Sequence, residues 1–274
     1  MSNKTLKIKD IRISNDLPIV LIAGPCQIES LNHSLKIAEI LCNLGQKLNF
    51  KLIFKGSFDK ANRTSINSKR GVGIEEGLTI LDKIKSEFNC PVLTDVHEPE
   101  QCSKTSEVTD VIQIPAFLCR QTDLLIAAGK TGKPLNIKKG QFLAPNDMKF
   151  IAQKISSVGN DNIMLCERGT SFGYNNLIND FRSIPIMAET GYPIVFDATH
   201  SVQLPGNNNG SSGGQRKFVP ALASAACAVG VAAIFIETHE DPDNAPSDGA
   251  NMIPLSEMEL VMSKIKVIDD LIKN

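Results

Sequence analysis

The chain has 274 residues, of which 42% are hydrophobic and 22% are charged, and its 29 Lys and Arg residues nearly balance its 30 Asp and Glu residues. A formal charge of −1 excludes a strong overall attraction to nucleic acid or anionic lipid, because binding these polyanions requires an excess of basic side chains. The length fits one or two ordinary domains, or one α/β barrel of about 250 residues.

The seven cysteines are scattered and contain no CxxC pair, which is typical of a reducing compartment. The N-terminal stretch MSNKTLKIKD lacks the apolar segment of an export signal. Residues 221–236 are apolar apart from Ser224, but they are fewer than the roughly 20 needed to span a bilayer. We therefore expect a cytoplasmic protein that has neither a membrane nor a nucleic acid as partner.

Taken in chain order, the first predicted element is an extra β-strand or β-hairpin over residues 6–13, where apolar and charged side chains alternate. We expect it to cover the bottom of the main fold. Short apolar runs rich in β-branched residues follow, and such runs are typical of strands buried on both faces. There are eight of them, at residues 19–23, 51–55, 92–96, 111–114, 134–138, 163–167, 193–197 and 232–237.

Amphipathic segments with apolar residues at helical spacing lie between several of these runs, for example in residues 74–88 and 255–268. Residues 221–236 read as a buried helix that continues into a buried strand. Eight strand–helix units predict an α/β fold, a (β/α)8 or TIM barrel, forming a single domain over residues 1–274. A doubly wound open sheet has the same periodicity and is the alternative.

The ends of the predicted strands carry most of the chemically useful side chains, and in barrel enzymes the active site lies at these ends. Six cations gather there or nearby: Lys55, Lys60, Arg63, Arg120, Lys138 and Arg168. Each taken singly fits an ordinary surface cation, but together they suit a substrate with several negative charges. The strand ends also carry Asp95, His97, Gln113, Glu167, Asp197 and His239.

A second group at the strand ends combines a thiol, an imidazole and two carboxylates, namely Cys26, His200, Glu237 and Asp248. This mixed donor set is acceptable to zinc, ferrous iron, manganese or cobalt. Taken alone, a buried cysteine more often packs as a small hydrophobic residue than binds a metal ion. The stretch 205–214, PGNNNGSSGG, follows the seventh strand and predicts either a solvated surface loop or a lid over the site.

Seven motifs spread over residues 18–255 resemble the family of 3-deoxy-D-manno-octulosonate 8-phosphate synthases, also called 2-dehydro-3-deoxyphosphooctonate aldolases. They are AGPCQIES, FKGSFDKANRTS, QIPAFLCRQTDLL, IKKGQFLAP, ERGTSFGYNNL, DATHSVQLPG and FIETHEDPDNAPSDG. The resemblance implies a homotetrameric (β/α)8 barrel. It also implies an enzyme that condenses phosphoenolpyruvate with arabinose 5-phosphate and water, with release of phosphate, for lipopolysaccharide core biosynthesis.

The resemblance also implies roles for individual residues. Phosphoenolpyruvate is expected to bind Lys55, Ser57, Lys60, Gln113, Ala116, Lys138 and Arg168. The pentose phosphate is expected to meet Asn62, Arg63 and Thr64, together with Arg120 from a neighbouring subunit. Cys26 stands where the metal-independent branch has Asn, so we expect one divalent metal ion held by Cys26, His200, Glu237 and Asp248. Lys138 and His200 are candidate proton-transfer groups, and Lys60 and Asp95 complete the predicted catalytic set.

Two alternative functions are weighed against this interpretation. A 3-deoxy-heptulosonate phosphate synthase would use erythrose 4-phosphate, but such enzymes typically have Pro directly before the Arg of the KANRTS stretch, where this chain has Asn62. A barrel that only binds a sugar phosphate, without catalysis, would need the cations but has little use for the Cys, His, Glu and Asp set.

Overall fold

The computed structural model describes residues 3–62, 69–208 and 211–273. Eight parallel strands pair in chain order, and β11 also pairs with β14, which pairs with β3, so the sheet closes into a barrel. The closure confirms the predicted TIM barrel and excludes the open sheet. The strands are β3 (Val20–Gly24), β4 (Lys51–Lys55), β5 (Val92–Asp95), β6 (Val111–Ile114), β7 (Leu135–Lys138), β8 (Ile163–Glu167), β11 (Ile194–Asp197) and β14 (Ala233–His239).

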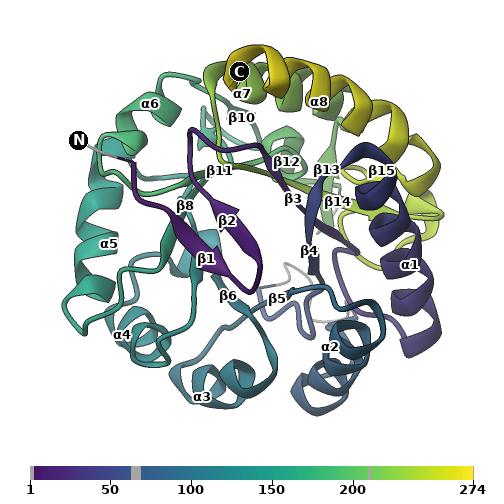
Figure 1. Ribbon diagram of the computed structural model, residues 1–274, viewed down its shortest axis with the longest axis horizontal. Helices are drawn as coiled ribbons and strands as arrows, with labels where there is room; N and C mark the ends of the chain where they lie inside the picture. The colour runs from purple at the N-terminus through teal and green to yellow at the C-terminus, as the bar shows by residue number, and fades with distance from the viewer. Residues whose placement is uncertain (1–2, 63–68, 209–210, 274) are drawn as a thin grey trace.

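Helices surround the barrel as an outer ring (Figure 1). They are α1 (Leu31–Leu48), α2 (Ile74–Phe88), α3 (Pro99–Val108), α4 (Thr122–Lys130), α5 (Met148–Ser156), α6 (Ser183–Ala188), α7 (Val219–Val229) and α8 (Met258–Lys273). At the start of α1, Ser30 Oγ accepts a hydrogen bond from the His33 N–H. Helices α1 and α2 end at Asn49 and Asn89, which adopt the left-handed conformation that asparagine tolerates. The periodic segments in residues 74–88 and 255–268 are therefore helical, as predicted.

An N-terminal hairpin closes one end of the barrel, in front of the strands in Figure 1. It consists of β1 (Leu6–Ile8) and β2 (Ile11–Ile13), which pair antiparallel. Its inward side chains, including Leu6 and Ile13, belong to the same buried cluster as Ile22, Ile53 and other side chains of the barrel strands. The alternating pattern of residues 6–13 thus places one apolar face on the barrel interior, which confirms the expected cover at the bottom.

The opposite end of the barrel carries smaller elements. β9 (Thr170–Ser171) pairs with β10 (Leu177–Ile178), β12 (Gln203–Asn208) pairs with β13 (Ser211–Gly214), and β15 (Ile253–Pro254) pairs parallel with the end of β14. The β12–β13 hairpin occupies most of the stretch 205–214, in which the sequence predicted a solvated surface loop or a lid. Backbone pairing needs no side-chain packing, so a Gly, Asn and Ser sequence supports it. Residues 209–210 lie outside the described part of the chain, and the role of this stretch as a lid stays a prediction.

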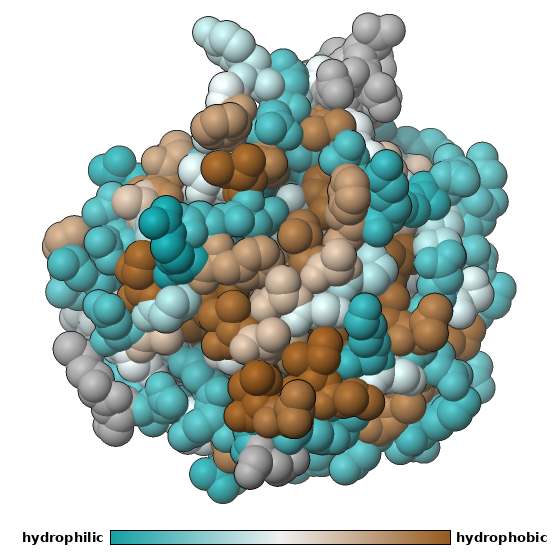
Figure 2. Space-filling view, turned by 90° about the horizontal axis from the view of Figure 1, so that it is seen from above, coloured by the Kyte–Doolittle hydropathy of each residue, from teal (hydrophilic) through white to brown (hydrophobic). Residues whose placement is uncertain are grey.

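The outer surface is mixed in polarity. No helix among the described residues is both long and apolar enough to cross a membrane. Figure 2 shows apolar surface scattered among polar surface on the side that carries α7 and α8. The apolar side chains of α8 that face solvent include Leu260, Val267 and Leu271, which are 77%, 69% and 81% exposed. Because these residues recur at helical spacing, they form an apolar stripe along α8.

Candidate active site

A cavity of about 520 Å³ lies at the carboxyl ends of the barrel strands. Parallel strands bring their carboxyl ends to one rim, and loops from distant parts of the sequence meet there. Most of the predicted site residues line this cavity: Lys60, Asn62, Asp95, Gln113, Ala116, Lys138, Arg168, His200, Glu237 and Asp248. The predicted convergence is therefore present in the structure.

The four predicted metal ligands come from four separate segments and meet on one side of this cavity. Cys26 Sγ lies 3.3 Å from Asp248 Oδ2, and the ligand atoms of Cys26, Glu237 and Asp248 all lie within 4.8 Å of one another. His200 Nε2 is 3.7 Å from Glu237 Oε2 and 3.9 Å from Asp248 Oδ2. The described residues thus contain a group that could hold a metal ion.

Two features of this group fit a cation. Glu237 Oε2 is buried and has no hydrogen-bond partner among the described residues, and an unpaired buried carboxylate oxygen is costly unless a cation compensates it. Burial, and then the negative charge of Glu237, raise the pKa of the Cys26 thiol well above its usual range. A divalent metal ion would place positive charge beside Glu237 Oε2 and the Cys26 sulfur, and would favour ionisation of the thiol.

The side chain of Asp197 orients the imidazole of His200. The His200 backbone N–H donates to Asp197 Oδ1 at 2.9 Å, and His200 Nδ1 lies 2.8 Å from Asp197 Oδ2. A carboxylate only accepts, so the proton of the neutral ring sits on Nδ1, and the Nε2 lone pair points toward Glu237 and Asp248. Burial alone would raise the pKa of Asp197, but His200 and Lys138 outweigh it, so this pKa lies well below its ordinary value. His200 is thus held in the tautomer that a metal ligand needs.

Cations form the other side of the cavity. Arg168 donates from Nη2 to Gln203 Oε1 at 2.9 Å, whereas its Nη1 is buried without a hydrogen-bond partner among the described residues. Lys138 pairs with Asp197, and its Nζ lies 3.6 Å from the centroid of the Phe235 ring. Buried guanidinium and ammonium groups with spare donors are suited to an anionic ligand that supplies oxygen atoms.

Lys60 adds a further positive charge, and its Nζ donates to Ser57 Oγ at 2.8 Å. Burial would lower the pKa of Lys60, but Cys26, Asp95 and Glu237 outweigh this effect, so the pKa of Lys60 is raised. The ammonium therefore stays charged at neutral pH. Asp95 in turn lies beside His97, whose Nε2 is 3.1 Å from Asp95 Oδ2.

The structure places Lys55 differently from the other predicted substrate ligands. Its Nζ lies 3.1 Å from the carbonyl oxygen of Pro25 and 2.8 Å from that of Cys26, and it forms an ion pair with Glu237. An ammonium has three N–H donors, so all of them are used. Lys55 does not line the cavity, and it holds the loop that carries Cys26 against the end of β14.

Two other predicted residues, Ser57 and Arg120, do not line the cavity. Ser57 is completely buried and contacts Lys60, and Arg120 is exposed between β6 and α4. Arg63 and Thr64 lie outside the described residues. Their expected contacts with substrate stay predictions.

Gln203 is a cavity residue that sequence reasoning missed. Its amide oxygen accepts from Arg168 Nη2 at 2.9 Å, and its amide nitrogen donates to Asp248 Oδ1 at 3.0 Å. One side chain therefore connects the cationic side of the cavity to the candidate metal side. Gln203 belongs to the motif DATHSVQLPG, but the motif does not show what its amide contacts, because its two partners, Arg168 and Asp248, are far away along the chain.

Comparison with known proteins fits this architecture. The model of the DAHP synthetase I family matches residues 2–274. The chain belongs to this family. Relatives from Rickettsia bellii and Rickettsia typhi are 58% and 59% identical over 270 residues, which cover 98% of this chain and 98% of each relative. A relative from Granulibacter bethesdensis is 59% identical over 266 residues, covering 97% of this chain and 94% of its own. All three bear the name 2-dehydro-3-deoxyphosphooctonate aldolase.

Proposed function

We propose that this member of the DAHP synthetase I family condenses phosphoenolpyruvate with arabinose 5-phosphate and water to give 3-deoxy-D-manno-octulosonate 8-phosphate and phosphate. The reaction belongs to lipopolysaccharide core biosynthesis. The observation that carries the proposal is the meeting of two sets of side chains at one cavity. The cations Lys60, Lys138 and Arg168 line it together with His200, Glu237 and Asp248, and Cys26 contacts Asp248. The name shared by relatives at 58–59% identity favours the octulosonate product over the heptulosonate alternative.

The chemistry of the reaction accounts for both sets. C3 of the enol ester forms a bond to the aldehyde carbon, C2 gains positive character and takes oxygen from water, and the aldehyde oxygen takes a proton. Cleavage of the C2–O bond to the phosphate group then leaves a ketone at C2, and the two protons of the water end on the new hydroxyl group and on the released phosphate. Two anionic substrates must be held side by side, and positioned cations both neutralise their mutual repulsion and orient them.

In this scheme, Arg168, Lys60 and Lys138 bind the phosphate and carboxylate of phosphoenolpyruvate, with Gln113 and Ala116 completing its pocket. The unpartnered Nη1 of Arg168 supports this assignment. Lys55 and Ser57 support the pocket from behind, which fits their burial. Arabinose 5-phosphate meets Asn62, Arg63 and Thr64, and Arg120 reaches it from a neighbouring subunit.

One divalent metal ion is part of the proposal, held by Cys26, His200, Glu237 and Asp248. Such an ion supplies Lewis-acid chemistry at an oxygen atom and orients its ligands. Side chains of the protein orient the ligands and exchange protons. Asp197 fixes the His200 ring. Of the two candidate proton-transfer groups, Lys138 exchanges protons with the reacting oxygen atoms, whereas His200 acts as a ligand, because its Nδ1 is used by Asp197 and its Nε2 faces Glu237 and Asp248. Asp95 and Lys60 carry opposite charges at the cavity wall. The positive charge of Lys60 lowers the pKa of Asp95 and so keeps this carboxylate ionised.

Self-association as a homotetramer and location in the cytoplasm complete the proposal. The apolar stripe on α8, with Leu260, Val267 and Leu271 largely exposed, supports self-association because covering such side chains removes apolar surface from water. Light scattering of the purified protein measures the molar mass directly. A monomer at micromolar concentration would contradict this part of the proposal.

The reaction is tested by measuring phosphate release with phosphoenolpyruvate and either arabinose 5-phosphate or erythrose 4-phosphate. We expect turnover with the five-carbon sugar, loss of turnover after chelation, and recovery on adding a divalent metal ion. Faster turnover of erythrose 4-phosphate would establish the heptulosonate reaction instead. Binding of both substrates without phosphate release, even after metal is restored, would establish a non-catalytic barrel.

A further inference from the structure

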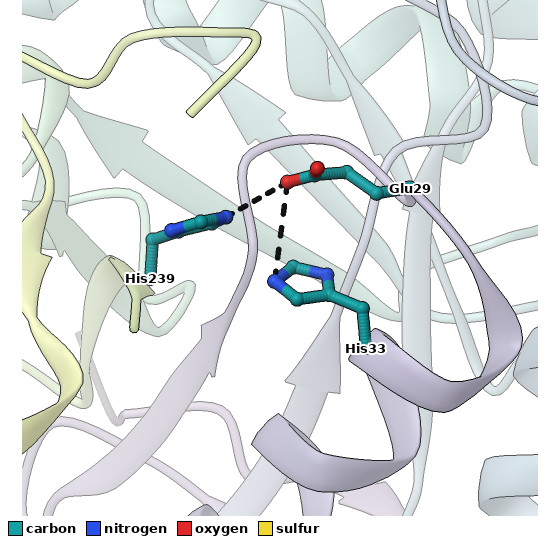
Figure 3. Close-up of side chains that lie close together, drawn as sticks. All are labelled: Glu29, His33 and His239. Carbon is teal, nitrogen blue, oxygen red and sulfur yellow. Dashed lines mark hydrogen bonds and ion pairs between the residues drawn. The ribbon is translucent and has the colours of Figure 1, made fainter. Parts of the chain in front are cut away.

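A second cluster of candidate ligands lies next to the proposed metal site. Figure 3 shows Glu29, His33 and His239, which come from the loop after β3, the first turn of α1 and the end of β14. His239 Nε2 lies 2.8 Å from Glu29 Oε1, and His33 Nε2 lies 3.9 Å from the same atom. By composition, two histidines and a glutamate resemble a metal site.

The hydrogen bonds of His239 argue against a metal ion in this cluster. The backbone N–H of Asp241 donates to His239 Nδ1 at 2.9 Å, so Nδ1 is the accepting nitrogen. The proton of the neutral ring then sits on Nε2, where it is donated to Glu29. His239 thus offers no lone pair toward the cluster, in contrast to His200, whose Nδ1 faces Asp197 and whose Nε2 is free to bind.

We propose that the hydrogen bond from His239 to Glu29 is a clasp that positions Cys26 relative to Glu237. This inference rests on the proposed metal site and gives Glu29 and His239 positioning roles, without contact to metal or substrate. The clasp is the pair Glu29 and His239, with His33 packed against the His239 ring.

The path of the backbone explains why a clasp is needed there. The ladder between β3 and β14 ends with Gly24 paired to Glu237. Beyond this pair the two segments separate: one continues to Cys26 and turns into α1, and the other runs on to His239. Each member of the clasp therefore lies two or three residues beyond a proposed metal ligand. Their hydrogen bond joins the two segments past the end of the backbone ladder.

Burial supports the clasp. The side chain of His239 is 8% exposed and that of His33 is 11% exposed. The two ring centroids are 4.7 Å apart, and the nitrogens of His33 have no hydrogen-bond partner among the described residues. His33 thus serves as a neutral packing surface that keeps the His239 ring in place. Glu29 itself is exposed, with its side chain 32% accessible, so the hydrogen bond is shielded on its histidine side, where the low local dielectric strengthens it.

A neighbouring contact supplies a matched control. Lys36, on the same side of α1 as His33, forms an ion pair with Glu240, and these side chains are 60% and 39% exposed. This pair also connects α1 to the segment after β14, but it is open to solvent and farther along the chain from both proposed ligands. We expect such an exposed pair to contribute little.

The test is the affinity of the metal-free protein for Zn²⁺, measured by competition with a chromophoric chelator, with thermal unfolding recorded for each variant. Glu29→Ala should weaken Zn²⁺ binding about tenfold, the lower range for partners that orient metal ligands. Glu29→Gln should bind like the parent chain, because its amide oxygen still accepts from His239 Nε2. Lys36→Ala should also match the parent chain.

Three results would overturn the clasp. Glu29→Ala could bind Zn²⁺ as tightly as the parent chain, Glu29→Gln could be as weak as Glu29→Ala, or the parent chain could bind a second Zn²⁺ that Glu29→Ala loses. The variant Cys26→Ala distinguishes a failure of the clasp from a failure of the proposed metal site. If that variant alone weakens binding, only the clasp is wrong, and if it binds like the parent chain, the ligand set itself is wrong.

Discussion

Lys55 and Glu237 form an ion pair inside the barrel, and each side chain is only 1% exposed. The remaining donors of Lys55 go to the carbonyl oxygens of Pro25 and Cys26. One ammonium therefore joins β4, the loop after β3 and the end of β14. Two of the proposed metal ligands depend on this contact for their position.

Replacing Lys55 with Met tests how much this pair stabilises the fold. Removal of one partner leaves the Glu237 carboxylate buried without compensation, so the free energy of unfolding of the metal-free protein should fall by about 3 kcal/mol. Urea denaturation measures the change. The matched control is Lys51→Met, because Lys51 pairs with Asp10 at the surface and should lose at most about 1 kcal/mol. Similar losses in both variants would contradict a special role for the buried pair.

Asp197→Asn tests the orientation of His200. An amide has one accepting oxygen, whereas Asp197 now accepts from the His200 backbone N–H, the His200 ring and Lys138. Loss of these contacts frees the ring tautomer, and the affinity for Zn²⁺ should fall about 10- to 100-fold. Chelator competition measures this affinity. Asp180→Asn makes the same chemical change at an exposed pair with Arg182 and should leave the affinity unchanged. Equal affinities for all three proteins would show that Asp197 does not orient a metal ligand.

Much of the fold follows from patterns that extend over several residues. The strands at 51–55, 111–114 and 163–167 have the predicted bounds, because residues buried on both faces read as continuous apolar runs. Closure of the barrel was inferred only from the number of strands. The hydrophobic pattern of a buried strand is the same whether β11 pairs with β14 or forms the open edge of a sheet. The small hairpins at the cavity rim were missed because two- to six-residue strands held by backbone pairing leave little trace in hydropathy.

The site shows the same limit at the level of single residues. Strand-end position was enough to predict that Lys138, Arg168 and His200 would meet. It could not show that Lys55, also at a strand end, turns its donors toward Pro25 and Glu237 instead of the cavity. Side-chain direction depends on neighbours in space, and these neighbours are far away in the sequence.

Arg168→Lys tests the cationic side of the cavity. Arg168 uses Nη2 for Gln203 and leaves Nη1 for a ligand, whereas lysine has a single nitrogen and cannot reproduce this fork. Loss of one charge-assisted hydrogen bond corresponds to about 1.5–3 kcal/mol, so the KM for phosphoenolpyruvate should rise tenfold or more. Steady-state phosphate release measures it. Arg182→Lys, with the arginine side chain 85% exposed, is the control and should keep the parent KM. An unchanged KM in Arg168→Lys would exclude Arg168 from the substrate pocket.

Asp95→Asn tests the charge balance of the cavity wall through the pH dependence of stability. Burial alone would raise the pKa of Asp95, but Lys60 and His97 outweigh it, so the folded-state pKa lies well below the usual value of 3.8. On acidification the unfolded chain therefore takes up a proton before the folded chain does, and stability that is present at neutral pH is lost as the pH falls below about 5.

Asparagine binds no proton, so Asp95→Asn should be less stable than the parent chain at neutral pH and should lose less stability between about pH 6 and pH 3. Urea unfolding at a series of pH values measures both effects. Asp82→Asn removes the same charge from the exposed face of α2 and serves as the control for net charge. If Asp95→Asn and the parent chain lose stability in parallel over this range, the carboxylate of Asp95 is not stabilised by Lys60 and His97.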